Sequence, residues 1–162
     1  MPVTIRPVTR ADGPDLAQAN HAARDFHAPW VQPFADAAGF DAWFPADDRR
    51  VAMLAEFDTA LAGVFTLSEI VRGAFRSAYL SYYAYPPQAG RGVMAQALAL
   101  VFAHAFGPVG LHRVEANIQP ANLRSIALVK RAGFRLEGIS PRYLFVDGAW
   151  RDHERWACLV DE

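Results

Sequence analysis

Residues 78–106 read AYLSYYAYPPQAGRGVMAQALALVFAHAF, and this stretch decides the fold. Residues 78–85 are apolar or aromatic on both faces, which is typical of a strand in the centre of a sheet. Pro86 and Pro87 end the strand, because proline cannot continue a strand ladder. Residues 93–106 are apolar almost all round, which predicts a helix packed on both sides. The stretch therefore predicts a strand, a glycine-containing loop and a long helix.

The flanking segments add strands and helices on both sides of this unit. Apolar runs between turn signals predict strands at residues 3–8, 51–57, 61–70, 111–118, 135–146 and 150–160. Start and stop signals predict helices at about 12–23 and 122–132. Residues 26–48 are interrupted by prolines but rich in aromatic side chains, so this segment should fold over another part of the protein. Because strands and helices are mixed, the predicted class is α+β, or mixed α/β, around one sheet.

Composition limits the remaining possibilities. The 162 residues are enough for one domain, so we expect a single domain over residues 1–162. A formal net charge of −1 provides no general attraction for nucleic acid. Cys158 is the only cysteine, which excludes an internal disulfide and fits a reducing cytoplasm. The apolar stretch 93–106 is shorter than the roughly 20 residues of a membrane span. We therefore expect a cytoplasmic protein without a membrane or nucleic-acid partner.

Gly90-Arg91-Gly92, directly before the long helix, is a candidate anion site. Glycines let the backbone approach an anion, and a helix start offers unpaired N–H groups. The loop has neither the Lys-Ser/Thr of a P-loop nor the spacing of a dinucleotide-binding loop. An ordinary tight turn is the alternative. Further on, Asn122 is a natural N-cap and Ser125 lies in the first turn of the next helix, where a hydroxyl can donate to an anion.

Several ordered motifs together make the pattern specific. They are Gly90-Arg91-Gly92-Val93-Met94, Leu111-His112-Arg113-Val114-Glu115-Ala116-Asn117, Asn122-Leu123-Arg124-Ser125 and Gly133-Phe134. With them, the chain resembles the GNAT superfamily of N-acetyltransferases. It is similar in particular to the RimJ/RimL branch, the ribosomal-protein-alanine N-acetyltransferases. The marks of that branch are Ala28-Pro29-Trp30, Ile70-Val71-Arg72-Gly73-Ala74-Phe75, Met94 and Asp147-Gly148-Ala149-Trp150-Arg151-Asp152-His153.

The resemblance implies a twisted mixed sheet, flanked by helices, whose two central strands splay apart around acetyl-CoA. It assigns the acetyl and pantetheine parts to backbone groups of Tyr82, Tyr83 and Ala84, with Asn122 also on the pantetheine arm. It assigns the pyrophosphate to the backbone of Ala89, Gly90, Arg91, Gly92, Val93 and Met94. Ser125 would approach the thioester sulfur. Many members use a tyrosine as general acid where this chain has Val129, so that role passes to Ser125.

Acetyl transfer needs a neutral amine, and Glu69 is the first candidate for the base. A solvated carboxylate, or a partner of Arg72, is the alternative reading of Glu69. An α-amino group has an ordinary pKa near 7.7–8.0, so a strong base is not essential for it. The acceptor pocket should be lined by Trp30 and by Tyr143 and Trp150 of the last predicted hairpin, unless these rings only seal the core. No spacing of the five histidines suggests a metal site.

Three functions remain. The first is acetylation of the N-terminal α-amine of a protein or peptide, with a ribosomal protein as the acceptor that the resemblance implies. The second is acetylation of a small amine, such as a polyamine, an amino acid or an aminoglycoside-like compound. The third is a sensor that binds acetyl-CoA without catalysis, against which the pair of Asn122 and Ser125 argues. The acceptor, the base, the openness of the cleft and a homodimer stay open.

Overall fold

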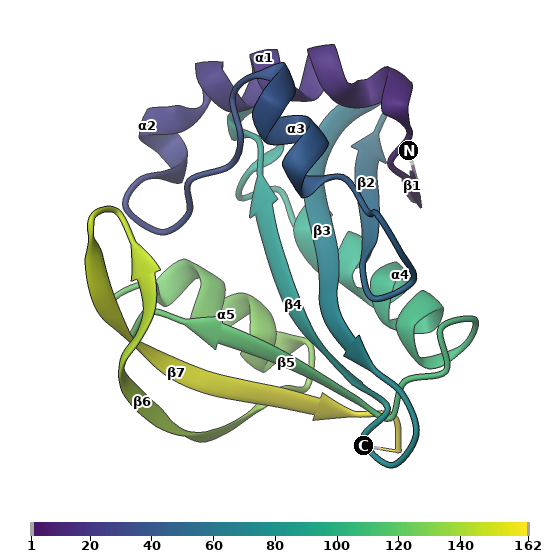
Figure 1. Ribbon diagram of the computed structural model, residues 1–162, viewed down its shortest axis with the longest axis vertical. Helices are drawn as coiled ribbons and strands as arrows, with labels where there is room; N and C mark the ends of the chain where they lie inside the picture. The colour runs from purple at the N-terminus through teal and green to yellow at the C-terminus, as the bar shows by residue number, and fades with distance from the viewer. Residues whose placement is uncertain (1, 162) are drawn as a thin grey trace.

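A seven-stranded sheet organises the computed structural model, which describes residues 2–161 (Figure 1). The spatial order is β1-β2-β3-β4-β5-β7-β6, so β4 is the middle strand, as the sequence predicts. The strands are β1 (Val3–Pro7), β2 (Val51–Phe57), β3 (Ala60–Val71), β4 (Ser77–Ala84), β5 (Arg113–Ile118), β6 (Arg135–Val146) and β7 (Ala149–Leu159). The helices are α1 (Gly13–Ala22), α2 (Arg24–His27), α3 (Ala37–Trp43), α4 (Val93–Phe106) and α5 (Leu123–Arg131), with short 3-10 turns η1 (Arg10–Asp12) and η2 (Pro86–Gln88).

The two central strands splay apart. β4 and β5 run parallel and pair only from Ser77–Tyr79 to Arg113–Glu115, whereas every other neighbouring pair is antiparallel. Within the described residues, Leu80–Ala84 has no strand partner on the side of β5. In Figure 1 the two strands diverge upward from a common lower end. The splayed pair that the family resemblance implied is therefore confirmed, and it leaves the backbone edge of β4 free.

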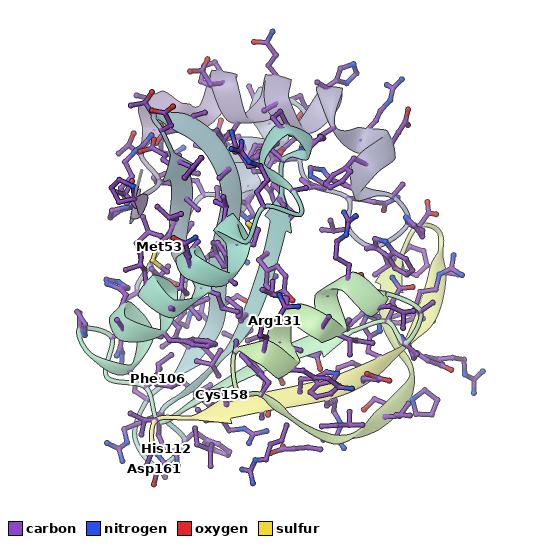
Figure 2. The ribbon with its side chains drawn as sticks, turned by 180° about the vertical axis from the view of Figure 1, so that it is seen from behind. Met53, Phe106, His112, Arg131, Cys158 and Asp161 are labelled. Carbon is purple, nitrogen blue, oxygen red and sulfur yellow. The ribbon has the colours of Figure 1, made fainter. Side chains whose placement is uncertain are left out.

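Each face of the sheet carries its own apolar core. Residues along β2 alternate between them: Met53 and Ala55 belong to one core, and Ala52 and Leu54 to the other. The first core is closed by α4 and α5, which lie side by side in front of the sheet in Figure 2. The second core is closed by α1 and α3. Helices therefore flank the sheet on both faces.

The long helix α4 packs on one side only, so the prediction of packing on both sides is wrong. Val93, Ala97, Leu98, Val101 and Ala105 are buried against the sheet. The opposite face is open to solvent at Gln96, Ala99, Leu100 and Ala103. Alanine adds little apolar area, so its exposure costs little free energy. Because the exposed face of α4 is rich in alanine, its sequence resembles that of a helix buried on all sides.

The aromatic segment after α1 folds over the second core, as expected, but it contains helices that the sequence analysis did not predict. Helix α3 begins after Asp36, whose side chain accepts a hydrogen bond of 2.7 Å from the N–H of Gly39. Phe34 and Trp43 stack on each other and on Phe40, with ring centroids 5.0–6.1 Å apart. These rings anchor the segment on the sheet and bring its earlier part, around Trp30, to the splayed strands.

Met94 at the start of α4 requires a glycine opposite it. A Cβ added to Gly63 of β3 would lie 2.6 Å from the Met94 sulfur and 2.8 Å from the carbonyl oxygen of Tyr83. Only a residue without a side chain allows this approach. Gly63 of β3 thus leaves the space that the Met94 side chain occupies. In the described part of the chain, no helix has the length and apolarity that crossing a membrane needs.

Candidate functional site

The first cavity, of about 380 Å³, lies where the edge of β4, the glycine loop and α5 meet. Eight of the ten residues predicted to bind the cofactor line it: Tyr82, Tyr83, Ala84, Ala89, Gly90, Gly92, Met94 and Asn122. Arg91 does not line it; its guanidinium lies over the Phe57 ring, 5.2 Å from the centroid, and donates to the side chain of Gln88 at 2.9 Å. Val93 does not line it either, because its side chain is buried in the core beneath α4.

Two glycines shape the loop side of the first cavity. Gly90 and Gly92 have φ values of +75° and +76°, a left-handed conformation that side chains disfavour. Gly92 is also the N-cap of α4, so the unpaired N–H groups of that helix begin at the cavity wall. Backbone N–H groups and the helix dipole together favour an anion at this point.

Two arginines add positive charge that the sequence analysis missed. Arg124 and Arg131 on α5 both line the first cavity, and Figure 2 labels Arg131 on that helix. None of the described residues that line this cavity is an Asp or a Glu. The signal in the sequence was the spacing of the two arginines, seven residues apart, which is two helical turns. The cavity is therefore suited to a polyanion.

A buried polar network supports β4 beneath the first cavity. The Tyr85 hydroxyl donates to Asn20 Oδ1 at 2.6 Å, and Asn20 Nδ2 donates to the Tyr83 hydroxyl at 3.3 Å. His27 Nε2 lies 2.9 Å from the Ala84 carbonyl, and because a carbonyl only accepts, Nε2 donates. Burial lowers the pKa of His27, so the ring is held neutral. This network fixes the strand on which the predicted acetyl-binding residues lie.

The second cavity, of about 350 Å³, adjoins the first between the splayed strands. Its walls come from β4 and β5, the end of β6, His153 of β7, the start of α5 and the segment after α2. Five residues line both cavities and form the wall between them: Trp30, Val31, Tyr82, Asn122 and Ser125. A ligand in the first cavity and a ligand in the second would therefore meet at this shared wall.

Ser125 and Tyr82 join their hydroxyl groups across the shared wall. The distance between Tyr82 Oη and Ser125 Oγ is 2.5 Å, and either atom is able to donate. Burial raises the pKa of Tyr82 to about 12, so its hydroxyl keeps its proton at neutral pH. Asn122 caps α5 by accepting from the N–H of Ser125 at 3.3 Å, as its position in the sequence predicted. The cap fixes the first turn of α5 and with it the place of Ser125.

The structure does not bring Glu69 to either cavity. In the antiparallel pair of β3 and β4, Ser68 lies opposite Tyr79, while the lining of the second cavity begins at Leu80 and that of the first at Tyr82. Glu69 is exposed, with φ of 50°, in a bulge just beyond Ser68. Glu69 lines neither cavity, so the structure does not place it among the residues that an acceptor in the second cavity would contact.

Of the three aromatic residues predicted for the acceptor pocket, only Trp30 lies at the site. Trp30 belongs to the shared wall. Tyr143 lines neither cavity, and a hydrogen bond with it raises the pKa of Tyr79. Trp150 is 61% exposed and stacks edge-to-face on Phe145, with ring centroids 5.6 Å apart. Phe145 lines the second cavity in place of Trp150.

Two polar residues of the second cavity escaped the sequence analysis as site residues. His153 on β7 is 3% exposed, and its Nδ1 lies 2.9 Å from the carbonyl oxygen of Arg151. Asn117 at the end of β5 has a buried Oδ1 without a hydrogen-bond partner among the described residues. Residues 2–161 contain no group of three or more His, Cys, Asp or Glu placed to hold a metal ion.

Comparison with known proteins gives a consistent result. Residues 3–135 match the family of acetyltransferase (GNAT) domains. The [ribosomal protein uS5]-alanine N-acetyltransferase of Escherichia coli is 32% identical over 167 residues, covering 93% of this chain and 84% of that protein. The probable N-acetyltransferase YjcK of Bacillus subtilis is 38% identical over 102 residues, covering 63% of this chain and only 56% of that protein.

Solved structures extend the likeness to the whole described fold. Mycobacterium smegmatis RimJ in complex with CoA-disulfide has a TM-score of 0.89 and 31% identity, over 98% of this chain and 82% of that one. Other matches are named for small acceptors: a Pseudomonas relative for methionine sulfoximine and methionine sulfone, and a fold neighbour for spermidine.

Proposed function

This chain belongs to the GNAT acetyltransferase family and is an acetyl-CoA-dependent N-acetyltransferase, and we propose that its acceptor is the N-terminal α-amino group of a protein or peptide. The relatives named for alanine acetylation of a ribosomal protein support a ribosomal protein as this acceptor. Such an acceptor would place the reaction in the cytoplasm. Family membership favours this enzymatic reading over a sensor that only binds acetyl-CoA.

Acetyl-CoA is proposed to occupy the first cavity. Its diphosphate would lie against the N–H groups at the start of α4, with Arg124 and Arg131 providing further positive charge. The pantetheine arm and the acetyl group would run along the free edge of β4 from Ala84 toward Tyr82. This placement brings the thioester to the shared wall, next to Ser125.

Ser125 is proposed to protonate the departing sulfur. The amine attacks the thioester carbonyl carbon, a C–N bond forms, and the C–S bond breaks to leave a thiolate. The Ser125 hydroxyl gives its proton to this thiolate, and Tyr82, hydrogen-bonded to Ser125 Oγ, stabilises the serine oxygen meanwhile. Because Tyr82 has a pKa of about 12, its hydroxyl is available as a donor at every physiological pH.

The absence of charge in the second cavity is the observation that carries the choice of acceptor. No Asp, Glu, Lys or Arg is among the described residues that line it. A polyamine carries several positive charges, and burying them without carboxylate partners costs several kcal/mol per charge. An α-amine is a single basic group with a pKa near 8, so a sizeable fraction is already neutral near pH 7–8. The second cavity is therefore suited to an acceptor that presents one neutral amine, such as the N-terminus of a peptide, and brings no further charge into the cavity.

The test is release of free thiol from acetyl-CoA, with mass spectrometry of the products. Peptides that begin with Ala, Ser or Met would be compared with matched peptides whose α-amine is blocked and whose internal lysine is free. Spermidine, methionine sulfone and an aminoglycoside complete the panel. Turnover of the unblocked peptides alone supports the proposal and gives the first-residue preference. Turnover of small amines alone contradicts it in favour of a small acceptor, and saturable binding without turnover on any amine would leave a sensor.

A further inference from the structure

The second cavity offers one side chain with a basic nitrogen. The described residues around it include no carboxylate and no lysine, and Tyr82 has a pKa of about 12. His153 is the remaining side chain of the cavity whose chemistry allows it to act as a general base. His27, the other buried histidine, lines the first cavity and not the second. The amine that enters the second cavity therefore meets one candidate base.

The hydrogen bond of His153 leaves the right nitrogen free. The Arg151 carbonyl can only accept, so His153 Nδ1 carries the hydrogen in the 2.9 Å bond between them. In the neutral ring, Nε2 then holds a lone pair, and no described residue donates to it. The bond also orients the ring, since the side chain is 3% exposed and packs against Tyr143, with centroids 6.3 Å apart.

The charged residues of β7 on either side of His153 are Arg151, Asp152, Glu154 and Arg155. Arg155 shares the face of His153, lies opposite Asn117 on β5, and has a buried Nε without a hydrogen-bond partner among the described residues. Arg151 donates to the carbonyls of Val146 and Asp147. Asp152 accepts from the N–H of Arg142, and Glu154 accepts from the indole of Trp156. Because side chains alternate along a strand, Asp152 and Glu154 point to the opposite face from His153. No carboxylate therefore competes with His153 for the proton of the amine on its own face of β7.

Asn117 supplies a second, independent sign that an N–H group binds in the second cavity. Its Oδ1 is buried and accepts no hydrogen bond from any described residue. The great majority of buried acceptors in proteins have a hydrogen-bond donor, and this oxygen lacks one. An amine or the first peptide N–H of an acceptor is such a donor. Asn117 and His153 come from neighbouring strands of the sheet and line the same cavity.

We propose that His153 Nε2 is the catalytic base and that Asn117 Oδ1 positions the acceptor amine, an assignment that rests on the proposed acetyl transfer. An incoming ammonium group loses one proton to solvent. The neutral nitrogen attacks the carbonyl carbon while Asn117 accepts one of its hydrogens. His153 Nε2 takes the second proton, directly or through one water, as the N–C bond forms. The thiolate receives a proton from Ser125, which is restored from solvent, and His153 returns its proton to solvent.

The test compares two histidine variants on the intact protein. In His153→Asn the amide nitrogen replaces Nδ1 as the donor to Arg151, but no base remains. His112→Asn is the matched control, because His112 lines neither cavity. The rate kcat/KM is followed from pH 6 to 10 with whichever amine the wild-type protein acetylates, and acetyl-CoA affinity is measured by calorimetry.

We expect His153→Asn to lower kcat/KM by about 10²-fold or more near pH 7, with unchanged acetyl-CoA affinity. The pH profile of kcat/KM should differ between His153→Asn and the wild-type protein, and free imidazole should restore activity to His153→Ala. Asn117→Ala should mainly raise KM for the amine. An unchanged pH profile in His153→Asn, or no response of His153→Ala to imidazole, overturns the proposal.

A measurement on the wild-type protein keeps the proposal falsifiable if the variants do not fold. Nitrogen-15 NMR of labelled histidine reports which ring nitrogen carries the hydrogen. The expected tautomer of His153 has hydrogen on Nδ1, and a hydrogen on Nε2 at neutral pH overturns the assignment. If the wild-type protein acetylates only small amines, the proposed acceptor fails while His153 is still tested with those amines. If it acetylates no amine, the proposed function itself fails.

Discussion

Ser125 carries the clearest prediction at the scale of single residues. Ser125→Ala removes the hydroxyl at the shared wall and leaves the N–H of residue 125 available to Asn122. We expect kcat to fall by about 10- to 100-fold, because a general acid is lost, with little change in acetyl-CoA affinity. Steady-state kinetics and calorimetry provide the measurement. Ser68→Ala, on a strand outside both cavities, is the control, and an unchanged kcat in Ser125→Ala would remove Ser125 from the mechanism.

Tyr82 should act only through Ser125. Tyr82→Phe removes the hydroxyl that lies 2.5 Å from Ser125 Oγ but keeps the ring that forms the wall. We expect a smaller loss of kcat than in Ser125→Ala, on the order of tenfold. The double variant should be no slower than Ser125→Ala alone, since residues in one network are not additive. Independent, multiplying losses would mean that Tyr82 touches the reacting atoms itself.

The sequence located the proposed acid but not the proposed base, and strand geometry explains why. Ser125 follows a recognisable cap, so its place on the helix was predictable. Glu69 lies near the end of β3 as expected, but the sequence alone did not indicate which residues face the cavities. The prediction named Trp150 and not Phe145, which lies directly opposite it in the last hairpin. The sequence pattern did not indicate which of these two neighbouring rings reaches the second cavity.

At the scale of elements, the glycine loop is expected to bind the cofactor through its backbone shape. Gly92→Ala introduces a side chain at φ of +76° and should distort the start of α4, weakening acetyl-CoA binding about tenfold or more. Gly148→Ala is a matched control, with φ of +77° in the turn between β6 and β7 and open space around its Cβ. Both variants should lose about 1 kcal/mol of stability. Equal acetyl-CoA affinities in calorimetry would show that the loop does not hold the cofactor.

The long elements followed their sequence patterns, and the short ones did not. The predicted strands and the helices at 93–106 and 122–132 appear with ends shifted by a few residues. Helix α2 spans only Arg24–His27, too few residues for any periodicity to appear. Helix α3 depends on its cap and on rings from distant sequence positions. Such elements are stabilised by tertiary packing, which a local reading does not contain.

At the scale of the whole molecule, buried tyrosines limit stability at high pH. Burial raises the pKa of Tyr82 and Tyr83 to about 12, and it raises that of Tyr85 as well. The folded state therefore holds these protons more tightly than the unfolded chain, whose tyrosines ionise near pH 10. This contribution is complete below pH 10 and is lost between about pH 10 and 12.

Denaturant unfolding measured from pH 8 to 12 tests this loss of stability. The free energy of unfolding should decline above pH 10 by about 2–3 kcal/mol for each of Tyr82 and Tyr83. The variant with both tyrosines changed to Phe should show a shallower decline. The same slope in this variant and in the wild type would mean that other groups control alkaline unfolding.

The shared wall between the two cavities also predicts that both substrates bind before any product is released. Because the two ligands would occupy separate cavities that share only one wall, neither needs to leave before the other arrives. The single cysteine, Cys158, is buried and lines neither cavity, so no thiol of the protein is placed to carry the acetyl group between half-reactions. Double-reciprocal plots at several fixed concentrations of the second substrate should therefore intersect rather than run parallel. The separation of the two central strands therefore predicts a kinetic mechanism in which both substrates are bound together in a ternary complex before the acetyl group is transferred.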